Sequence, residues 1–181
     1  MLIYATCKIS KTGGNWLGSA ATILDSLDTL WIMNLTEEFD DCRKFVAEEL
    51  DFTKTRGKLF DCTTLLKFHP GDMSNFETTI RALGGLLSAY DLSHDHVFLQ
   101  KAEQLGDLMI KAMWSGGETQ IWPFATVNLR TGRGMNPTWT GGNVILSEVA
   151  TLQLEFFYLA MKTGRPEFAA KVNFWGCLFV S

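Results

Sequence analysis

Histidine, cysteine and proline are scarce in this sequence. Its 181 residues include three His, four Cys and four Pro. No Cys-x-x-Cys pair occurs, and the four cysteines are widely spaced at Cys7, Cys42, Cys62 and Cys177. That spacing is typical of neither a zinc ribbon nor a redox motif. We therefore predict no metal site from these residues and interpret the thiols as buried or incidental, while one disulfide of unassigned pairing stays open.

The sequence also lacks a basic excess and a long apolar run. Sixteen Lys and Arg against 20 Asp and Glu give a formal net charge of −4, which argues against nucleic acid as a partner. No stretch approaches the roughly 18 apolar residues that span a bilayer. The short apolar stretch within residues 1–8 follows no basic residue and is too short for the core of a signal peptide. We therefore expect no transmembrane segment and no targeting signal in this chain.

The remaining composition is that of a folded globular protein. Hydrophobic residues make up 46% of the chain and charged residues 20%, which is too apolar for a disordered segment. The length allows one domain, or two small ones, with enough chain to bury a core.

Six stretches follow the 3.6-residue apolar repeat of helices that pack on one face. We expect these helices over about 19–33, 36–50, 74–90, 95–113, 147–163 and from 166 onward. Ser74, three residues before Glu77, predicts a capping box, and Gly164 followed by Pro166 predicts a helix end and a new start. Thr36 is expected to cap the second helix, so the sequon that it completes is weak evidence for a secretory compartment.

The connections between the expected helices alternate in length. Short turns join the helices within each pair, whereas residues 51–73 and 115–143 read as long loops between pairs. Consecutive helical hairpins indicate an all-α bundle, solenoid or toroid, and no βαβ alternation, dinucleotide fingerprint or P-loop occurs. In a toroid the long loops would gather on one face, where binding chemistry is usually built.

One polar stripe runs beside the apolar stripe of the third helix. Glu77 and Arg81 lie one turn apart, so their side chains can pair. Gly84 and Gly85 each cost about 1 kcal/mol relative to Ala within a helix, which predicts a close approach there by another helix or a ligand. The spacing alone favours a structural role for this stripe over a catalytic one.

Three blocks of sequence carry a more specific signal. They read ATILDSLDTLWIM at 21–33, FETTIRALGGLLSAY at 76–90 and SEVATLQLEF at 147–156, with the loop VNLRTG at 127–132 between the last two. In this order they resemble the signatures of glycoside hydrolase family 47, the class I α-1,2-mannosidases. The resemblance extends over about 14–171, whereas residues 172–181 form a divergent tail.

The resemblance implies a fold and an activity. Members of the family form a barrel of seven helical hairpins with a calcium ion at the base of a carbohydrate cavity. They remove terminal α-1,2-linked mannose from high-mannose N-glycans, with inversion, in the endoplasmic reticulum or Golgi, and are often membrane-anchored. This chain would then be an all-α, partial (α/α) toroid, an arc of about three hairpins of the seven.

The resemblance also implies roles for three residues. Glu77 matches the general acid, Arg81 a sugar-contacting arginine, and Glu148 a carboxylate that lines the mannose pocket. Inverting hydrolysis needs one carboxylic acid and a second carboxylate that activates water. Asp25 and Asp28 are interpreted as structural carboxylates that bond loop backbone or a basic partner, and Glu155 as a packing or ion-pair residue. The three tryptophans of the long loop would either stack on sugars or anchor that loop. These are Trp114, Trp122 and Trp139.

Motifs that the family uses later in its sequence are absent from residues 1–181. They include the catalytic base and the threonine that holds calcium, so we interpret the chain as a single incomplete catalytic domain. An open arc would leave apolar faces in water, and we expect the isolated chain to be inactive.

Two alternatives to an α-1,2-mannosidase fragment stay open. One is a non-catalytic mannose-binding module like the endoplasmic reticulum degradation-enhancing mannosidase-like proteins. The other is a helical-repeat scaffold for protein partners, which is disfavoured because no motif recurs at a fixed period.

Overall fold

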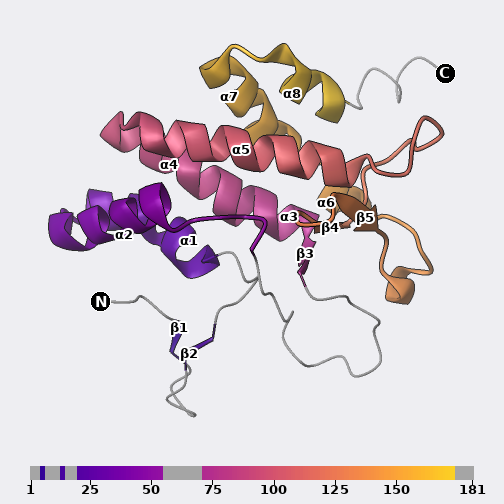
Figure 1. Cartoon of the computed structure of the whole chain (residues 1–181). Helices are drawn as coiled ribbons and strands as arrows, with labels where there is room; N and C mark the ends of the chain where they lie inside the picture. Colours follow the sequence, from indigo (N-terminus) through magenta and orange to yellow (C-terminus); the bar gives the residue numbers. More distant parts are fainter. Residues whose placement is uncertain (1–4, 7–12, 15–19, 55–70, 174–181) are drawn as a thin grey trace.

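The computed structural model describes residues 5–6, 13–14, 20–54 and 71–173, and most of them are helical (Figure 1). The longer helices are α1 (Ala21–Ile32), α2 (Thr36–Glu48), α4 (Gly84–Ser93), α5 (His96–Met113), α7 (Gln153–Thr163) and α8 (Pro166–Val172). Shorter pieces are α3 (Asn75–Glu77), the π-helical η2 (Thr78–Leu83), the 3-10 helix η3 (Thr138–Thr140) and α6 (Leu146–Val149). No described helix has both the length and the apolar character needed to cross a membrane.

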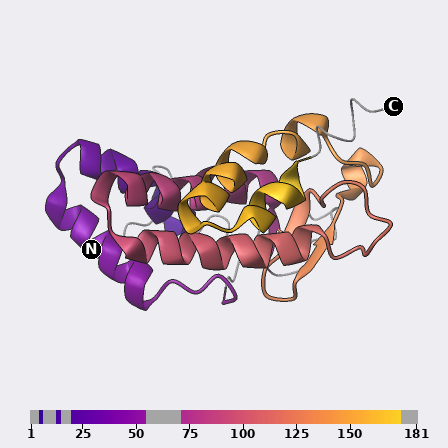
Figure 2. The same cartoon turned by 90° about the horizontal axis from the view of Figure 1, so that it is seen from above.

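The longer helices form three hairpins in sequence order. α1 contacts α2, α4 contacts α5, and α7 contacts α8. The first helices of the hairpins also contact one another in the order α1, α4, α7, and the second helices do so in the order α2, α5, α8. Viewed from above, α7 and α8 lie over the α4–α5 pair (Figure 2). The predicted helical hairpins are therefore confirmed, and they pack as two layers.

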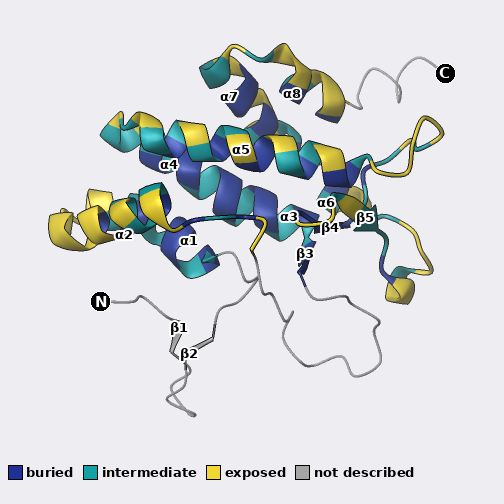
Figure 3. Ribbon diagram, in the orientation of Figure 1, coloured by how far each residue is buried: buried dark blue, intermediate teal, exposed yellow. Residues whose placement is uncertain are grey.

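Apolar side chains between the two layers make one continuous core. Figure 3 shows α4 made mainly of buried and intermediate residues, whereas α2 is mostly exposed. Phe39 of α2 packs edge-on against Trp31 of α1, with ring centroids 5.0 Å apart, and lies 5.6 Å from the ring of Phe98 of α5. The third hairpin packs closely on α5, because a Cβ atom at Gly106 would lie 2.6 Å from Leu159 Cδ2 and 3.0 Å from Phe168 Cε1. Within that hairpin the fully buried rings of Phe168 and Phe156 lie 6.5 Å apart. Burial of such large side chains is the main source of stability for this fold.

Gly85 explains how closely α1 and α4 approach. A Cβ atom at this position would lie 2.2 Å from the carbonyl oxygen of Leu24 in α1. Only a residue without a side chain permits that distance, so the expected close helix approach is confirmed at Gly85. The neighbouring Gly84 has only ordinary van der Waals distances around the same added atom, the nearest being 3.6 Å.

Several helix ends follow the sequence signals. The Ser74 hydroxyl accepts a hydrogen bond from the Glu77 amide at 3.2 Å, which is the serine half of the predicted capping box. Gly164 ends α7 with φ 70°, and Pro166 begins α8. The prediction for Thr36 was wrong, because Leu35 holds the N-cap position and no side chain caps α2.

Two of the expected helices are interrupted. The helix expected over 147–163 is divided into α6 and α7. The third expected helix is π-helical over Thr78–Leu83. At its start the Thr78 and Thr79 hydroxyls donate to backbone carbonyls four residues earlier, at 2.7 and 2.9 Å. Such bonds compete with the regular helical pattern, and π-turns are frequent at functional sites.

Short strands occupy segments that read as loops. β3 (Asp72–Ser74), β4 (Thr126–Asn128) and β5 (Arg133–Met135) form an antiparallel sheet in the order β3–β4–β5, and β1 (Ala5–Thr6) pairs with β2 (Gly13–Gly14). The all-α expectation therefore holds for the two layers but missed this sheet, because three-residue strands are too short to show an alternating pattern.

Cys42 is a free, buried thiol, as the cysteine interpretation expects. The other three cysteines, Cys7, Cys62 and Cys177, lie outside the described residues, as does the tail from 174 to 181.

Candidate active site

Glu77 stands at a junction that distant parts of the chain hold in place. β3 leads directly into α3, and β3 pairs with β4 from a segment some fifty residues later. The Asn75 amide nitrogen donates to the Ala125 carbonyl at 2.8 Å, and the Asn75 side chain donates to the Phe124 carbonyl at 3.2 Å. Backbone and side-chain bonds thus fix the helix turn that carries Glu77.

Arg81 bridges two carboxylates from different helices. Its Nε donates to Glu77 Oε2 at 2.5 Å, and its Nη1 donates to Asp25 Oδ2 at 2.8 Å. These hydrogen bonds, the one to Glu77 foremost, raise the pKa of Arg81 above its ordinary value. The predicted Glu77–Arg81 pair is confirmed. Asp25 has the basic partner that its structural interpretation expects.

Glu148 approaches the same place from α6, which contacts α3. Burial raises the pKa of the Glu148 carboxyl, and the negative charge of Glu77 raises it further. The carboxylates are therefore close enough to repel. Such an arrangement favours the protonated form of one of them. The structure thus brings together the three residues singled out in the sequence, from η2, α3 and α6.

A groove of about 580 Å³ lies beside these residues, between α1, α4 and α7. Its polar lining groups are Asp25, Asp28, Ser88, Asp91, Glu155 and Tyr158. Asp25 connects the groove to the site, because it both lines the groove and binds Arg81. Glu77, Arg81 and Glu148 are not among the residues of its wall.

Two further groove carboxylates, those of Asp28 and Asp91, are also hydrogen-bonded. Asp28 accepts from the Ser88 hydroxyl at 3.3 Å and from the Thr29 amide at 2.6 Å, which are groups of α4 and α1 rather than loop backbone or a basic side chain. Asp91 accepts from the Tyr158 hydroxyl and pairs with Lys162 Nζ at 2.8 Å. Hydrogen bonds from Lys162 and then Tyr158 lower the pKa of Asp91. These contacts also connect α4 to α7.

Glu155 differs from the other groove carboxylates. Its Oε2 atom is buried and has no hydrogen-bond partner, and burial raises the pKa of this carboxyl. No ion pair to Glu155 occurs within the described part of the chain. The ion-pair half of the sequence interpretation was therefore wrong. No sequence pattern marked this residue as unpaired, because pairing depends on which helices meet.

Two of the loop tryptophans differ in burial. Trp114 is partly buried and packs against the core, as an anchor would. Trp139, on η3, is 62% exposed.

The described residues do not suit a metal ion. They contain no group of three or more His, Cys, Asp or Glu side chains placed to bind one. The calcium ion that the resemblance implies does not fit these residues, and no chemical step below passes through it.

Comparisons with known proteins agree with this fold. The sequence profile described as Glycosyl hydrolase family 47 matches residues 6–175. Mannosyl-oligosaccharide 1,2-alpha-mannosidase MNS1 of Arabidopsis thaliana is 46% identical over 157 residues, which cover 86% of this chain and 25% of that protein. The endoplasmic reticulum mannosyl-oligosaccharide 1,2-alpha-mannosidase of Rattus norvegicus is 40% identical over 165 residues, covering 91% of this chain and 22% of that protein.

Among solved structures, an alpha-1,2-mannosidase from Trichoderma reesei has the same fold over this region. It superposes with a TM-score of 0.65 at 22% sequence identity, covering 90% of this chain and 33% of that one. The chain thus spans about a quarter or less of the length of these two curated relatives, and a third of the structural neighbour.

Proposed function

Because this chain belongs to glycosyl hydrolase family 47, we propose that it carries the acid-bearing part of an α-1,2-mannosidase active site. Its substrate is the terminal α-1,2-linked mannose of a high-mannose N-glycan, and the reaction inverts the anomeric carbon. The bridge from Glu77 through Arg81 to Asp25, with Glu148 beside it, is the observation that carries this proposal.

Each residue of this group has a chemical role in the proposal. Glu77 is the general acid and delivers a proton to the leaving glycosidic oxygen. The Nε atom of Arg81 donates to the Oε2 atom of Glu77, and in this proposal the Oε1 atom of Glu77 faces the substrate. The guanidinium of Arg81 and the carboxyl of Glu148 bind the sugar hydroxyls. The raised pKa of Glu148 suits a carboxyl that donates as well as accepts a hydrogen bond.

The three hairpins form an arc of a seven-hairpin (α/α) barrel in this proposal. The described chain exposes large apolar side chains on α1 and α7, which supports an arc whose inner side is open. Ile32 is 72% exposed, Leu154 76% and Met161 65%. The groove lies on this same side, since Ile32 and Leu154 also line it.

The isolated 181-residue chain releases no mannose in this proposal. Inverting hydrolysis needs a second catalytic carboxylate that activates water from the opposite face, and the motif for that base is not among residues 1–181. We place the full-length protein in the secretory pathway, since some of the relatives are named as endoplasmic reticulum enzymes.

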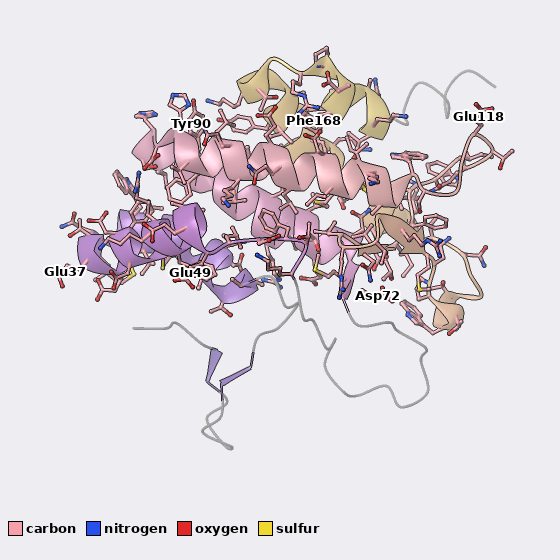
Figure 4. All side chains as sticks on the ribbon, viewed as in Figure 1. Glu37, Glu49, Asp72, Tyr90, Glu118 and Phe168 are labelled. Carbon is pink, nitrogen blue, oxygen red and sulfur yellow. The ribbon has the colours of Figure 1, made fainter. Side chains whose placement is uncertain are left out.

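Titration of the purified chain with sugars tests the proposal. Methyl α-D-mannoside should bind, methyl α-D-glucoside should bind at least five-fold more weakly, and Glu77→Gln should weaken mannoside binding. Glu118→Gln is the matched control, because Glu118 is exposed in the loop that follows α5 (Figure 4). Absence of mannoside binding, or equal binding by the Glu77 variant, would contradict the site.

A product assay separates activity from binding. Incubation with α-1,2-mannobiose should yield no free mannose from this chain. Release that depends on Glu77 would support the site and overturn the proposed inactivity.

A further inference from the structure

We propose that Asn34, in the turn between α1 and α2, is an acceptor for N-linked glycosylation. Asn34, Leu35 and Thr36 form the Asn-x-Ser/Thr triplet that such an acceptor requires. The co-substrate is an oligosaccharide carried on a lipid pyrophosphate in the lumen of the endoplasmic reticulum. This inference rests on the secretory location proposed above, and it is independent of the chemistry at Glu77.

The structure removes the competing role expected for Thr36. If its hydroxyl capped α2, the helix backbone would hold that hydroxyl, but Leu35 takes the N-cap position and no side chain caps this helix. Thr36 is exposed, and within the described part of the chain no hydrogen bond engages its side chain. The hydroxyl that completes the acceptor triplet is therefore accessible.

Asn34 lies in an exposed turn. Its φ of 57° is left-handed, and its backbone amide donates to the Trp31 carbonyl at 3.0 Å. Asparagine adopts this backbone conformation more readily than most other residues. All of residues 31–38 are exposed, as the ribbon around the start of α2 shows (Figure 3). A glycan is bulky and must project into solvent, which this turn permits in the folded protein.

A second Asn-x-Thr triplet, Asn136-Pro137-Thr138, provides a contrast within the same chain. Proline at its middle position excludes it as an acceptor. The Asn136 side chain is also held on both sides, because Nδ2 donates to the Gly142 carbonyl at 2.9 Å and Oδ1 accepts from the Ala125 amide at 3.1 Å. The two triplets therefore differ both in sequence chemistry and in the freedom of the asparagine.

Apolar side chains surround Asn34 at the tip of the first hairpin. Met33 is 64% exposed, Trp31 41% and Leu35 38%. Large apolar side chains that are exposed together usually mark a surface that something covers. A hydrophilic glycan on Asn34 would cover this tip and keep it solvated.

A glycan at Asn34 leaves the Glu77 site accessible. Asp25, which accepts a hydrogen bond from Arg81, lies near the start of α1, whereas Asn34 follows the end of that helix. At a rise of 1.5 Å per residue, the stretch from Asp25 to Ile32 separates the two positions by about 10 Å of helix. Glycosylation and sugar binding can therefore be measured independently.

The transfer step balances without an oxidant or reductant. The Asn34 Nδ2 atom forms a bond to the anomeric carbon of the oligosaccharide as the bond from that carbon to the pyrophosphate oxygen breaks. The amide loses one proton to a base of the transferase, and the lipid pyrophosphate leaves with the electron pair. This chain supplies only the acceptor nitrogen and the Thr36 hydroxyl.

Translation in the presence of microsomes tests the acceptor directly. The whole 181-residue chain is preceded by a cleavable signal peptide, and protease protection identifies the molecules that have entered the lumen. The unmodified chain and Thr36→Ser should carry one glycan, which peptide N-glycosidase removes and mass spectrometry assigns to Asn34. Asn34→Asp, which keeps a residue tolerated in a left-handed turn, and Thr36→Ala should carry none. Asn136→Asp is the matched control and should keep the glycan.

The outcomes separate the modification from the proposed function. A protected chain without a glycan, or a glycan that survives Asn34→Asp or Thr36→Ala, would overturn the acceptor site. The glycosylated chain and Asn34→Asp should bind methyl α-D-mannoside with affinities within two-fold of each other. If the glycan is present but neither form binds the mannoside, the function at Glu77 fails and the acceptor site stands. A bare Asn34 in the protein purified from its own cells would overturn the modification.

Discussion

Replacing Gly85 by alanine would drive a methyl group into the backbone of α1. The added carbon would lie 2.2 Å from the Leu24 carbonyl oxygen and 2.9 Å from its carbon, whereas real Cβ atoms essentially never approach within 3.0 Å. Both groups in this clash belong to helix backbone, so no side chain can rotate away. α1 and α4 must separate, and the core between them loosens.

The size of the effect follows from two opposing contributions. Overpacking a close contact costs typically 1–3 kcal/mol, and a backbone clash belongs at the upper end of that range. Alanine regains about 1 kcal/mol of helix propensity over glycine. We therefore expect Gly85→Ala to lower the free energy of unfolding by about 2 kcal/mol, which corresponds to a Tm lower by about 4–8 °C for a chain of this size. Gly84→Ala is the matched control, since it has the propensity gain without the clash and should raise Tm by about 2–4 °C.

Thermal unfolding followed by circular dichroism measures both variants under the same conditions. The two substitutions are chemically identical and adjacent in sequence, so a difference in sign reports only on the surroundings of each glycine. If Gly85→Ala were as stable as the unmodified chain, or if both variants moved in the same direction, the close packing of α1 on α4 would be refuted.

Three further predictions concern charge and burial. Asp25→Asn removes one of the two carboxylates that Arg81 binds. Because this ion pair is partly exposed, the free energy of unfolding measured in urea should fall by only about 0.2–1 kcal/mol, and a larger fall would contradict the prediction. The pKa of Glu155 is raised in the folded state, so its contribution to stability is present below its ordinary pKa of 4.5 and is lost as pH rises. The Tm of Glu155→Gln minus the Tm of the unmodified chain should therefore increase as the pH is raised from about 4 to about 7. A Tm difference that stays constant over this pH range would contradict the prediction. Burial raises the pKa of the Cys42 thiol, so peptide mapping after iodoacetamide treatment should find Cys42 modified only when denaturant is present. Rapid modification of Cys42 in the native protein would contradict this prediction.

Local features of the fold could be read from short stretches of sequence. The apolar repeats marked the helices, Ser74 and Gly164 marked two of their ends, and the spacing of Glu77 and Arg81 predicted their ion pair. All of these depend on residues within about four positions of each other. Helical geometry alone therefore places the partners.

Features that depend on distant partners could not be read in the same way. The β3–β4 sheet joins residues more than fifty positions apart, and Asp25 reaches Arg81 across fifty-six positions. The sequence marked Asp25 only as a structural carboxylate that would bond either loop backbone or a basic partner. It did not show which arginine or lysine of the chain would lie opposite.

The order of the helical hairpins and the pairing of Glu77 with Arg81 were thus set by residue patterns along the chain. The groove, the approach of Glu148 to Glu77 and the unpaired oxygen of Glu155 arise only when α1, α4, α6 and α7 pack together. The physical reason is that burial and charge repulsion depend on neighbours in space, and those neighbours come from segments that share no local repeat.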